Sequence, residues 1–213
     1  MSDIAGEEIP RHWGTSRVEA FSDGVFAIAI TLLVLDIHVP ATEFHNLWAG
    51  IAHEWPSYLG YATSFAIVGG IWLAHHGVFR RLRYANDRVM RLNLLLLMAV
   101  SLLPFPTSLV AQTIRSTNAE RAAVIFYGAS LLVIRLLFSA MWASAITDRT
   151  LLKPEVTDRE ITQVQLDAAP NIGLFVGATA LAIFAPRAAA FVYLAIALLG
   201  IARVRGDSRA ETA

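Results

Sequence analysis

Cysteine is absent from the 213-residue chain, and charged residues make up only 16% of it. Without cysteine the protein has no disulfide, no thiolate metal ligand and no cysteine nucleophile. Soluble globular chains carry about 25% charged residues, which help to cover the surface that faces water. With 56% apolar residues, this chain has too few polar groups to cover such a surface. We therefore expect lipid to surround much of the protein.

A net charge is also absent, because 17 basic residues balance 17 acidic ones. The chain thus has no long-range electrostatic attraction to nucleic acid, and we expect no nucleic-acid partner. The first eight residues are acidic and lack the basic region that opens a cleavable signal peptide. We expect the first apolar segment to stay in the protein as a membrane span.

Six apolar stretches are each close to the ~17–25 residues that a helix needs to cross a bilayer. They lie near residues 16–38, 57–79, 89–111, 121–146, 166–185 and 187–203. The alternating segments of a membrane barrel are missing, and open sheet edges are unstable in hydrocarbon, so strands are not expected. The sequence predicts an all-α integral membrane bundle of six transmembrane helices. Pro104 and Pro106 predict a kink or an end in the third helix.

Lysine and arginine are divided unevenly between the two sides of this bundle, and they are typically enriched on the cytoplasmic side. Thirteen lie before the first span, in the 2–3 and 4–5 loops or in the tail, whereas three lie in the other loops and Arg135 lies within the fourth span. We therefore expect a multi-pass protein of the cell (inner or plasma) membrane with both termini in the cytoplasm. Its predicted parts are a cytoplasmic N-terminus (1–15), a six-helix transmembrane domain (16–203) and a cytoplasmic tail (204–213).

The loop between the first two spans has a helical pattern of its own. Phe44, Leu47, Trp48, Ile51 and Trp55 recur at helical spacing with polar residues between them. Aromatic side chains of this kind favour the level of the lipid headgroups. We predict an outer interfacial helix near residues 43–55, with a loosely ordered loop as the alternative.

Asp23 is an ionisable residue within the first span, about 9 Å along the helix from Arg17. A carboxylate at that depth is costly unless it faces protein or water. Its expected partners are the polar and aromatic side chains at the same depth in the second and third spans: Trp72, His75, His76 and Asn93. Adjacent residues on a helix point about 100° apart, so we expect only one of the two histidines to join this layer.

Another face of the first span carries residues spaced by three and four positions. They are Arg17, Phe21, Gly24, Ile28, Thr31 and Leu35. The outer part of this stripe is apolar except for Thr31, and two structures fit it: an ordinary packing interface, or a hydrophobic constriction that gates an ion path by dewetting. Periodicity alone favours the packing interface, because apolar stripes occur in any helix bundle.

The start of the first span also resembles a known family. The segment Arg17-x-x-x-Phe21-Ser22-Asp23, followed by Gly-Val-Phe-Ala-Ile-Ala-Ile-Thr-Leu-Leu-Val-Leu, is similar to the signature of the transmembrane protein 175 family of potassium channels, prokaryotic branch. The resemblance extends over the whole chain as one six-span unit with a Trp and a His late in the second span and an Asn early in the third. It implies a homotetramer around a central pore lined by the first helix of each subunit.

The resemblance also implies roles for individual residues of the first helix. Ile28 and Leu35 would form apolar constriction rings, and Leu32, about 40° from the stripe, would share the constriction. The hydroxyl of Thr31 would form a polar ring that helps to favour potassium. The motif residues Arg17, Phe21, Ser22 and Asp23 would be structural, holding the first helix against the second and third.

A carbonyl-lined filter of the usual potassium-channel kind is excluded, because the chain has no Thr-Val-Gly-Tyr-Gly loop. Selectivity would then come from the cost of moving a hydrated ion past apolar rings, and we expect a weak preference for K⁺ over Na⁺. K⁺ is the expected permeant ion. No cofactor, no metal site and no small-molecule substrate beyond monovalent cations are expected.

A proton-coupled secondary transporter is the alternative function, because such proteins use ionisable groups in or near the membrane. The candidate groups are Asp23, Asp36, His75, Arg135 and Asp167. No inverted repeat and no pair of broken helices, which many transporters have, is visible in the sequence. An enzyme is not expected, since the chain has no His-Glu-x-x-His, no Gly-x-Ser-x-Gly and no cysteine.

Overall fold

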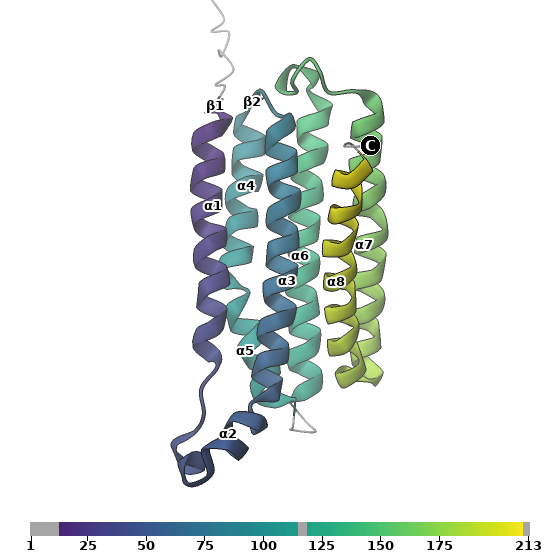
Figure 1. Ribbon diagram of the computed structural model, residues 1–213. Coiled ribbons are helices and arrows are strands. Elements are labelled where there is room, and N and C mark those ends of the chain that lie inside the picture. The colour runs from purple at the N-terminus through teal and green to yellow at the C-terminus, as the bar shows by residue number, and fades with distance from the viewer. Residues whose placement is uncertain (1–12, 115–118, 211–213) are drawn as a thin grey trace, which may run out of the picture.

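The computed structural model describes residues 13–114 and 119–210, and their side chains except those of residues 163, 165–171 and 201–210. Figure 1 shows a bundle of long helices with a smaller helical unit beyond one end. The elements in chain order are β1 (Trp13–Gly14), α1 (Thr15–Leu32), η1 (Leu33–Asp36), η2 (Ala41–Asn46), α2 (Leu47–His53), α3 (Trp55–Arg81), β2 (Tyr84–Ala85), α4 (Asp87–Leu102), α5 (Pro104–Thr113), α6 (Glu120–Thr147), η3 (Arg149–Leu151), α7 (Asp158–Phe184) and α8 (Pro186–Ala210).

Four helical stretches of the described chain are long and apolar enough to cross a membrane. They are Thr15–Asp36 (α1 with η1), Trp55–Arg81 (α3), Asp87–Thr113 (α4 with α5) and Glu120–Thr147 (α6). The helices α7 and α8 contain the shorter apolar stretches Ile172–Phe184 and Pro186–Gly200. The prediction of a helical membrane bundle is therefore confirmed, whereas the count of six spans stays a prediction.

The third predicted span is broken at its first proline. α4 ends at Leu102 and α5 begins at Pro104, which has no N–H to donate to Val100. The N–H of Leu103 donates to the Val100 carbonyl instead (3.1 Å), which closes a tighter, 3₁₀-type turn. The predicted kink or end at Pro104 is confirmed.

Two short strands depart from the expectation of a chain without strands. β1 and β2 pair antiparallel at the end of the bundle where α1 begins, with Trp13 opposite Ala85 and Gly14 opposite Tyr84. The indole N–H of Trp13 also donates to Asp87 at the start of α4 (3.2 Å). These strands join loops and do not cross the bilayer, so their formation does not conflict with the exclusion of strands from hydrocarbon.

The loops at this end of the bundle are also connected to one another. Leu82 and Leu152 form a second antiparallel bridge, and the N–H of Lys153 donates to the carbonyl of Arg81 (3.0 Å). The N-terminal arm, the α3–α4 loop and the α6–α7 loop are thus held together by backbone hydrogen bonds. The start of α1 is fixed to this assembly of loops through β1.

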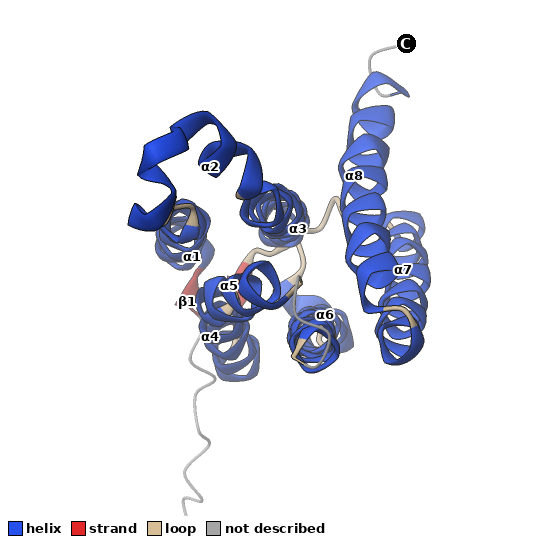
Figure 2. Cartoon of the chain, turned by 90° about the horizontal axis from the view of Figure 1, so that it is seen from below, coloured by secondary structure: helices blue, strands red, loops and turns tan. Residues whose placement is uncertain are grey.

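α1 lies at the edge of the bundle, where it packs against α3 and α4. Figure 2 shows the bundle end-on, with α1 on one side and the α7–α8 pair on the opposite side. Between them, a buried hydroxyl cluster joins α3, α5 and α6: Ser64 Oγ lies 2.7 Å from Thr107 Oγ1 and 2.9 Å from the Tyr127 hydroxyl.

The packing of α6 against α7 and α8 depends on a glycine. Tyr193 of α8 is fully buried, its hydroxyl lies 2.9 Å from Thr179 Oγ1, and its ring stacks on Phe175. A Cβ atom at Gly128 of α6 would overlap the Tyr193 hydroxyl and the Thr179 side chain. The close approach of these three helices therefore requires that residue 128 has no side chain.

We expect Gly128→Ala to destabilise the bundle, because one methyl group would push Tyr193 and Thr179 out of their present positions. Overpacking of this kind typically costs about 1–3 kcal/mol. Thermal unfolding of the purified protein in detergent should show a lower apparent Tm. Gly70→Ala on α3 is the matched control, since no atom lies within 4 Å of a Cβ there. Equal Tm values for the two variants would contradict the packing argument.

Candidate functional site

The buried face of α1 determines how this helix is oriented in the bundle. Its buried residues, spaced by three and four positions as one helix face requires, are Val18, Ser22, Phe26 and Ala29, and Leu33 of η1 continues this face. The helix starts after Gly14 without a side-chain cap and ends in the 3₁₀ turn η1. The face opposite these residues is left without a partner in the described chain.

Three fully buried polar side chains link α1, α4 and α3 in one layer. The side-chain amide of Asn93 donates to Ser22 Oγ (3.0 Å), and its carbonyl oxygen lies 2.8 Å from His75 Nε2. Because the amide oxygen can only accept, Nε2 of His75 carries the proton in this arrangement. The Ser22 hydroxyl donates to the Val18 carbonyl (2.8 Å). Ser22, Asn93 and His75 thus form a continuous hydrogen-bond chain, which we call the inner polar chain.

Aromatic rings enclose the histidine of the inner polar chain. The ring of Phe26 from α1 meets the imidazole of His75 edge-on with centroids 5.3 Å apart, and Phe79 stacks on it at 4.4 Å. These contacts exclude water from the hydrogen bonds, and a hydrogen bond in such low-dielectric surroundings is stronger than one in water. The rotation of α1 about its own axis is therefore set by both packing and hydrogen bonding.

Asp23 lies beside this chain and makes a separate contact. Its Oδ1 accepts a hydrogen bond from the indole N–H of Trp72 on α3 (2.8 Å), and both residues are partly exposed. One helical turn nearer the start of α1, Glu19 Oε1 lies 2.6 Å from Nδ1 of His76 on α3. The seam between α1 and α3 therefore carries two polar contacts one helical turn apart.

The predicted layer differs from the observed one in its members. We expected Asp23 to share one network with Trp72, Asn93 and a histidine, but the structure places the adjacent Ser22 in contact with Asn93. Of the two histidines, His75 lies in the inner polar chain, whereas His76 faces Glu19. Sequence reasoning missed Glu19. The signal was available, because Glu19 and Asp23 are four residues apart on α1, as Trp72 and His76 are on α3.

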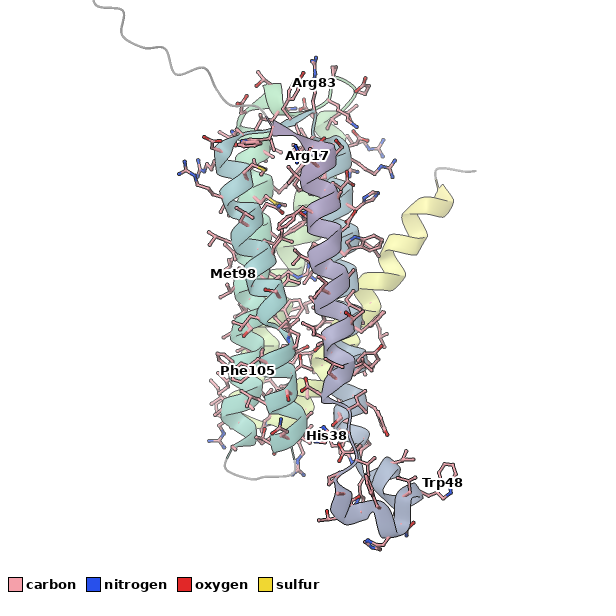
Figure 3. All side chains as sticks on the ribbon, turned by 90° about the vertical axis from the view of Figure 1, so that its left-hand side faces the viewer. Arg17, His38, Trp48, Arg83, Met98 and Phe105 are labelled. Carbon is pink, nitrogen blue, oxygen red and sulfur yellow. The ribbon has the colours of Figure 1, made fainter. Side chains whose placement is uncertain are left out.

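The other two motif residues, Arg17 and Phe21, lie on the open side of α1. Arg17 is exposed, and Phe21 has 57% of its surface exposed. Both therefore belong to the face that points away from α3 and α4, so the expectation that they hold α1 against these two helices is wrong within the described subunit. Figure 3 looks onto this side of the molecule and shows Arg17 near the start of α1.

The predicted stripe continues along the same open face toward η1. Ile28 is 61% exposed, Leu35 is 71% exposed, and Leu32 and Thr31 are exposed as well. The Thr31 hydroxyl donates to the Ile28 carbonyl within the helix (2.9 Å). A face of large apolar side chains along a whole membrane span must contact either lipid or another protein surface.

Of the described ionisable groups of the transporter alternative, Asp23 and His75 lie near each other between α1 and α3, whereas Asp36 and Arg135 lie elsewhere. Asp23 pairs with Trp72, and Asp36 lies at the end of η1. Arg135 lies in α6 with its guanidinium over the ring of Phe175 of α7, 5.3 Å from the centroid. The side chain of Asp167 lies outside the described residues. Within those residues, no group of three or more His, Asp or Glu is placed to hold a metal ion.

Comparison with known proteins shows extensive similarity. A family model described as the endosomal/lysosomal potassium channel TMEM175 matches residues 17–104. A potassium channel of Streptomyces collinus is 42% identical over 143 residues, which cover 67% of this chain and 69% of that protein. A potassium channel of Chamaesiphon minutus is 39% identical over 177 residues, which cover 82% of this chain and 87% of that protein.

A solved structure shares the architecture as well. It is the crystal structure of a lysosomal potassium-selective channel TMEM175 homolog from Chamaesiphon minutus, which matches with a TM-score of 0.80 at 36% sequence identity. The match covers 89% of this chain and 97% of that one. The similarity therefore extends well beyond the segment that the family model matches.

We expect Asn93→Ala to lower the stability of the bundle strongly, because it removes the acceptor of the His75 N–H and the donor to Ser22 in a buried layer. Each buried group left without a partner costs about 1–3 kcal/mol. Trp72→Phe is the control, since it removes one hydrogen bond at a partly exposed position. Thermal unfolding in detergent should show the larger loss of apparent Tm for Asn93→Ala. The reverse order would show that the inner polar chain is not the stabilising layer.

Proposed function

Because the chain belongs to the TMEM175 family of ion channels, we propose that it forms a potassium-permeable cation channel with a weak preference for K⁺ over Na⁺. The family and the relatives above are ion channels and not enzymes. The observation that carries the proposal is the open face of α1, where Ile28 and Leu35 project away from the rest of the subunit. The transporter alternative has less support, because Asp36 and Arg135 lie apart from Asp23 and His75.

The subunits assemble as a homotetramer around a central axis, with the open face of α1 from each copy turned toward that axis. Four copies bury apolar side chains that lipid would otherwise cover, and they enclose a path along the whole span. In a ring with closed rotational symmetry, every subunit makes the same contacts, so no copy leaves its open face uncovered. Each subunit spans the membrane six times, with α7 and α8 as the fifth and sixth spans.

The pore narrows at rings of apolar side chains. Ile28 and Leu35 form two constrictions, and Leu32 contributes to the outer one. A narrow apolar ring excludes water unless it widens, so an ion must pay a large dehydration cost to pass it. The ring of Thr31 hydroxyls between the constrictions offers oxygen atoms to the partly dehydrated ion, which favours K⁺ because K⁺ loses its hydration shell more readily than Na⁺.

The motif residues at the start of α1 hold the pore-lining helix in place. Ser22 and Asp23 hold α1 against its neighbours through the contacts to Asn93 and Trp72. Arg17 and Phe21 lie on the open face, where they contact the neighbouring subunit. His75 completes the inner polar chain, and His76 pairs with Glu19 at the inner end of the contact between α1 and α3. None of these residues binds the permeant ion.

The arginine-rich loops lie in the cytoplasm of the cell, so the chain has a cytoplasmic N-terminus (1–15), a transmembrane domain (16–203) and a cytoplasmic tail (204–213). The loops α3–α4 and α6–α7 carry the excess of Lys and Arg that faces the cytoplasm. The unit formed by η2 and α2 then lies at the outer end of the bundle. We use inner and outer in this sense below.

Flux from liposomes tests the proposed activity. Purified protein is reconstituted with K⁺ inside and either K⁺ or Na⁺ outside, and a potential-sensitive dye reports the membrane potential. We expect a K⁺ diffusion potential with Na⁺ outside, reduced when Thr31 is replaced by Ala. A permeability ratio on the order of hundreds would contradict the weak selectivity expected of apolar rings. Failure of any ion gradient to generate a potential would favour the transporter.

We expect Leu35→Asn to raise the conductance several-fold, because an amide ring is wetted where a leucine ring excludes water. Single-channel currents in planar bilayers measure this directly. Leu102→Asn is the matched control, since Leu102 is 57% exposed near the end of α4 but does not lie on α1. If both variants conduct like the unmodified protein, the open face of α1 does not line the pore.

A further inference from the structure

The connection between α1 and α3 forms a compact unit at the outer end of the bundle. It consists of η2 and α2, residues 41–53, which we call the outer unit. Figure 1 shows it beyond the end of the bundle next to α1 and α3, and Figure 3 shows Trp48 pointing away from the rest of the molecule. Between Arg17 and Arg80 the sequence has no Lys or Arg, so the outer unit carries no permanent positive charge.

The outer unit is held in shape by contacts on one side of α2. The side chain of Asn46 caps α2 by accepting from the N–H of Ala49 (3.4 Å). His53 Nδ1 lies 3.3 Å from Glu43 Oε1. A Cβ atom at Gly50 would come within 2.8 Å of Val39 Cγ1, so only glycine allows this close packing. Gly50 is therefore covered by the chain that precedes α2, while His53 remains exposed beside it.

The other side of α2 is apolar and uncovered. Leu47, Trp48 and Ile51 lie within an arc of about 100°. Trp48 is 84% exposed, more than any other large apolar side chain named for the described residues, and Leu47 and Ile51 are exposed as well. A free apolar arc of this width is what an amphipathic helix buries in a membrane surface.

The position of α2 along the bundle places this arc at the lipid headgroups. The 27 residues of α3 span about 40 Å, which matches a bilayer of ~30 Å hydrocarbon with its headgroup regions, ~40–45 Å in all. α2 joins the outer end of α3 at Trp55, and the Tyr58 hydroxyl donates to the Ile51 carbonyl (3.1 Å) to fix the junction. When the inner end of α3 lies at one headgroup layer, α2 therefore lies at the other.

We propose that the outer unit is a membrane anchor whose Leu47, Trp48 and Ile51 insert into the headgroup layer of the outer leaflet. Lipid is the occupant because the arc continues into the exposed aromatic side chains of Trp55 and Tyr58 on the membrane-spanning helix α3. The arc has no hydrogen-bonding group besides the Trp48 indole, as suits a lipid boundary. Because the unit lacks Lys and Arg, it suits neutral or zwitterionic lipid and gains nothing from anionic lipid. The anchor tethers the outer ends of α1 and α3, independently of whether the protein conducts ions.

The absence of cysteine makes a direct test simple, since any introduced cysteine is the only thiol in the chain. Leu47→Cys and Ala49→Cys place a nitroxide label at two exposed positions about 160° apart on α2. The labelled proteins are reconstituted in phosphatidylcholine vesicles, and electron paramagnetic resonance measures collisions with oxygen, which concentrates in lipid, and with a water-soluble nickel chelate. We expect the ratio of oxygen to nickel collisions to be several-fold higher at position 47 than at position 49.

A second variant keeps the test decisive if the label itself disturbs the anchor. Adding Trp48→Glu to Leu47→Cys should lower the oxygen-to-nickel ratio at position 47, because a carboxylate opposes insertion. Equal access to the nickel chelate at both positions would overturn the proposal in favour of a unit in water. Protection of position 47 from both reagents would overturn it in favour of contact with another subunit.

Discussion

The inner polar chain of Ser22, Asn93 and His75 is the constraint on which the rest of the molecule depends. It joins α1, α4 and α3 through fully buried side chains, with the amide of Asn93 bonded to both of its neighbours. Polar groups in a water-free layer are costly when unpaired, so rotation of α1 by even one residue is strongly disfavoured. The orientation of the open face of α1 follows from this chain, although none of its three members lies on that face.

α3 is the hub of the bundle, because it contributes to two buried polar layers. His75 belongs to the inner polar chain, and Ser64, eleven residues earlier, bonds to Thr107 and Tyr127 in the outer half. Eleven residues are about three helical turns, so both side chains lie on nearly the same face of α3. α1 takes part only in the inner layer, whereas its outer half is held by apolar contacts of Phe26, Ala29 and Leu33.

Long apolar runs and the proline at position 104 were sufficient to predict the four longest apolar helical stretches and the break between α4 and α5. The depth of Asp23 predicted a polar layer between the first three spans, but not that Ser22 would enter it. A serine hydroxyl can donate to the carbonyl four residues earlier in its own helix, as Ser22 does, so a serine in a span indicates no particular partner. Ser22 and Asp23 point about 100° apart, and which of them faces Asn93 depends on the rotation of α1, which the packing of Phe26 on His75 helps to set. The short strands escaped prediction because they are formed by loop backbone. In place of one interfacial helix near 43–55, the structure has η2 and α2, and α3 begins at Trp55. The position of this segment at the membrane interface stays a prediction.

The pairing of Trp13–Gly14 with Tyr84–Ala85 fixes the inner end of α1, so a tilt of the helix would pivot about that end. Backbone hydrogen bonds and three side-chain contacts hold that end, and beyond Asp23 the helix has no further polar contact to another helix among the described residues. From Thr15 to Leu35 the arm measures about 30 Å at ~1.5 Å per residue. Each degree of tilt then moves Leu35 by about 0.5 Å, whereas Ser22, about 10 Å from Thr15, moves by about 0.2 Å. In the proposed ring of four such arms, a tilt of a few degrees changes the free radius by about the radius of a water molecule, while the buried contact at Ser22 shifts only a third as far.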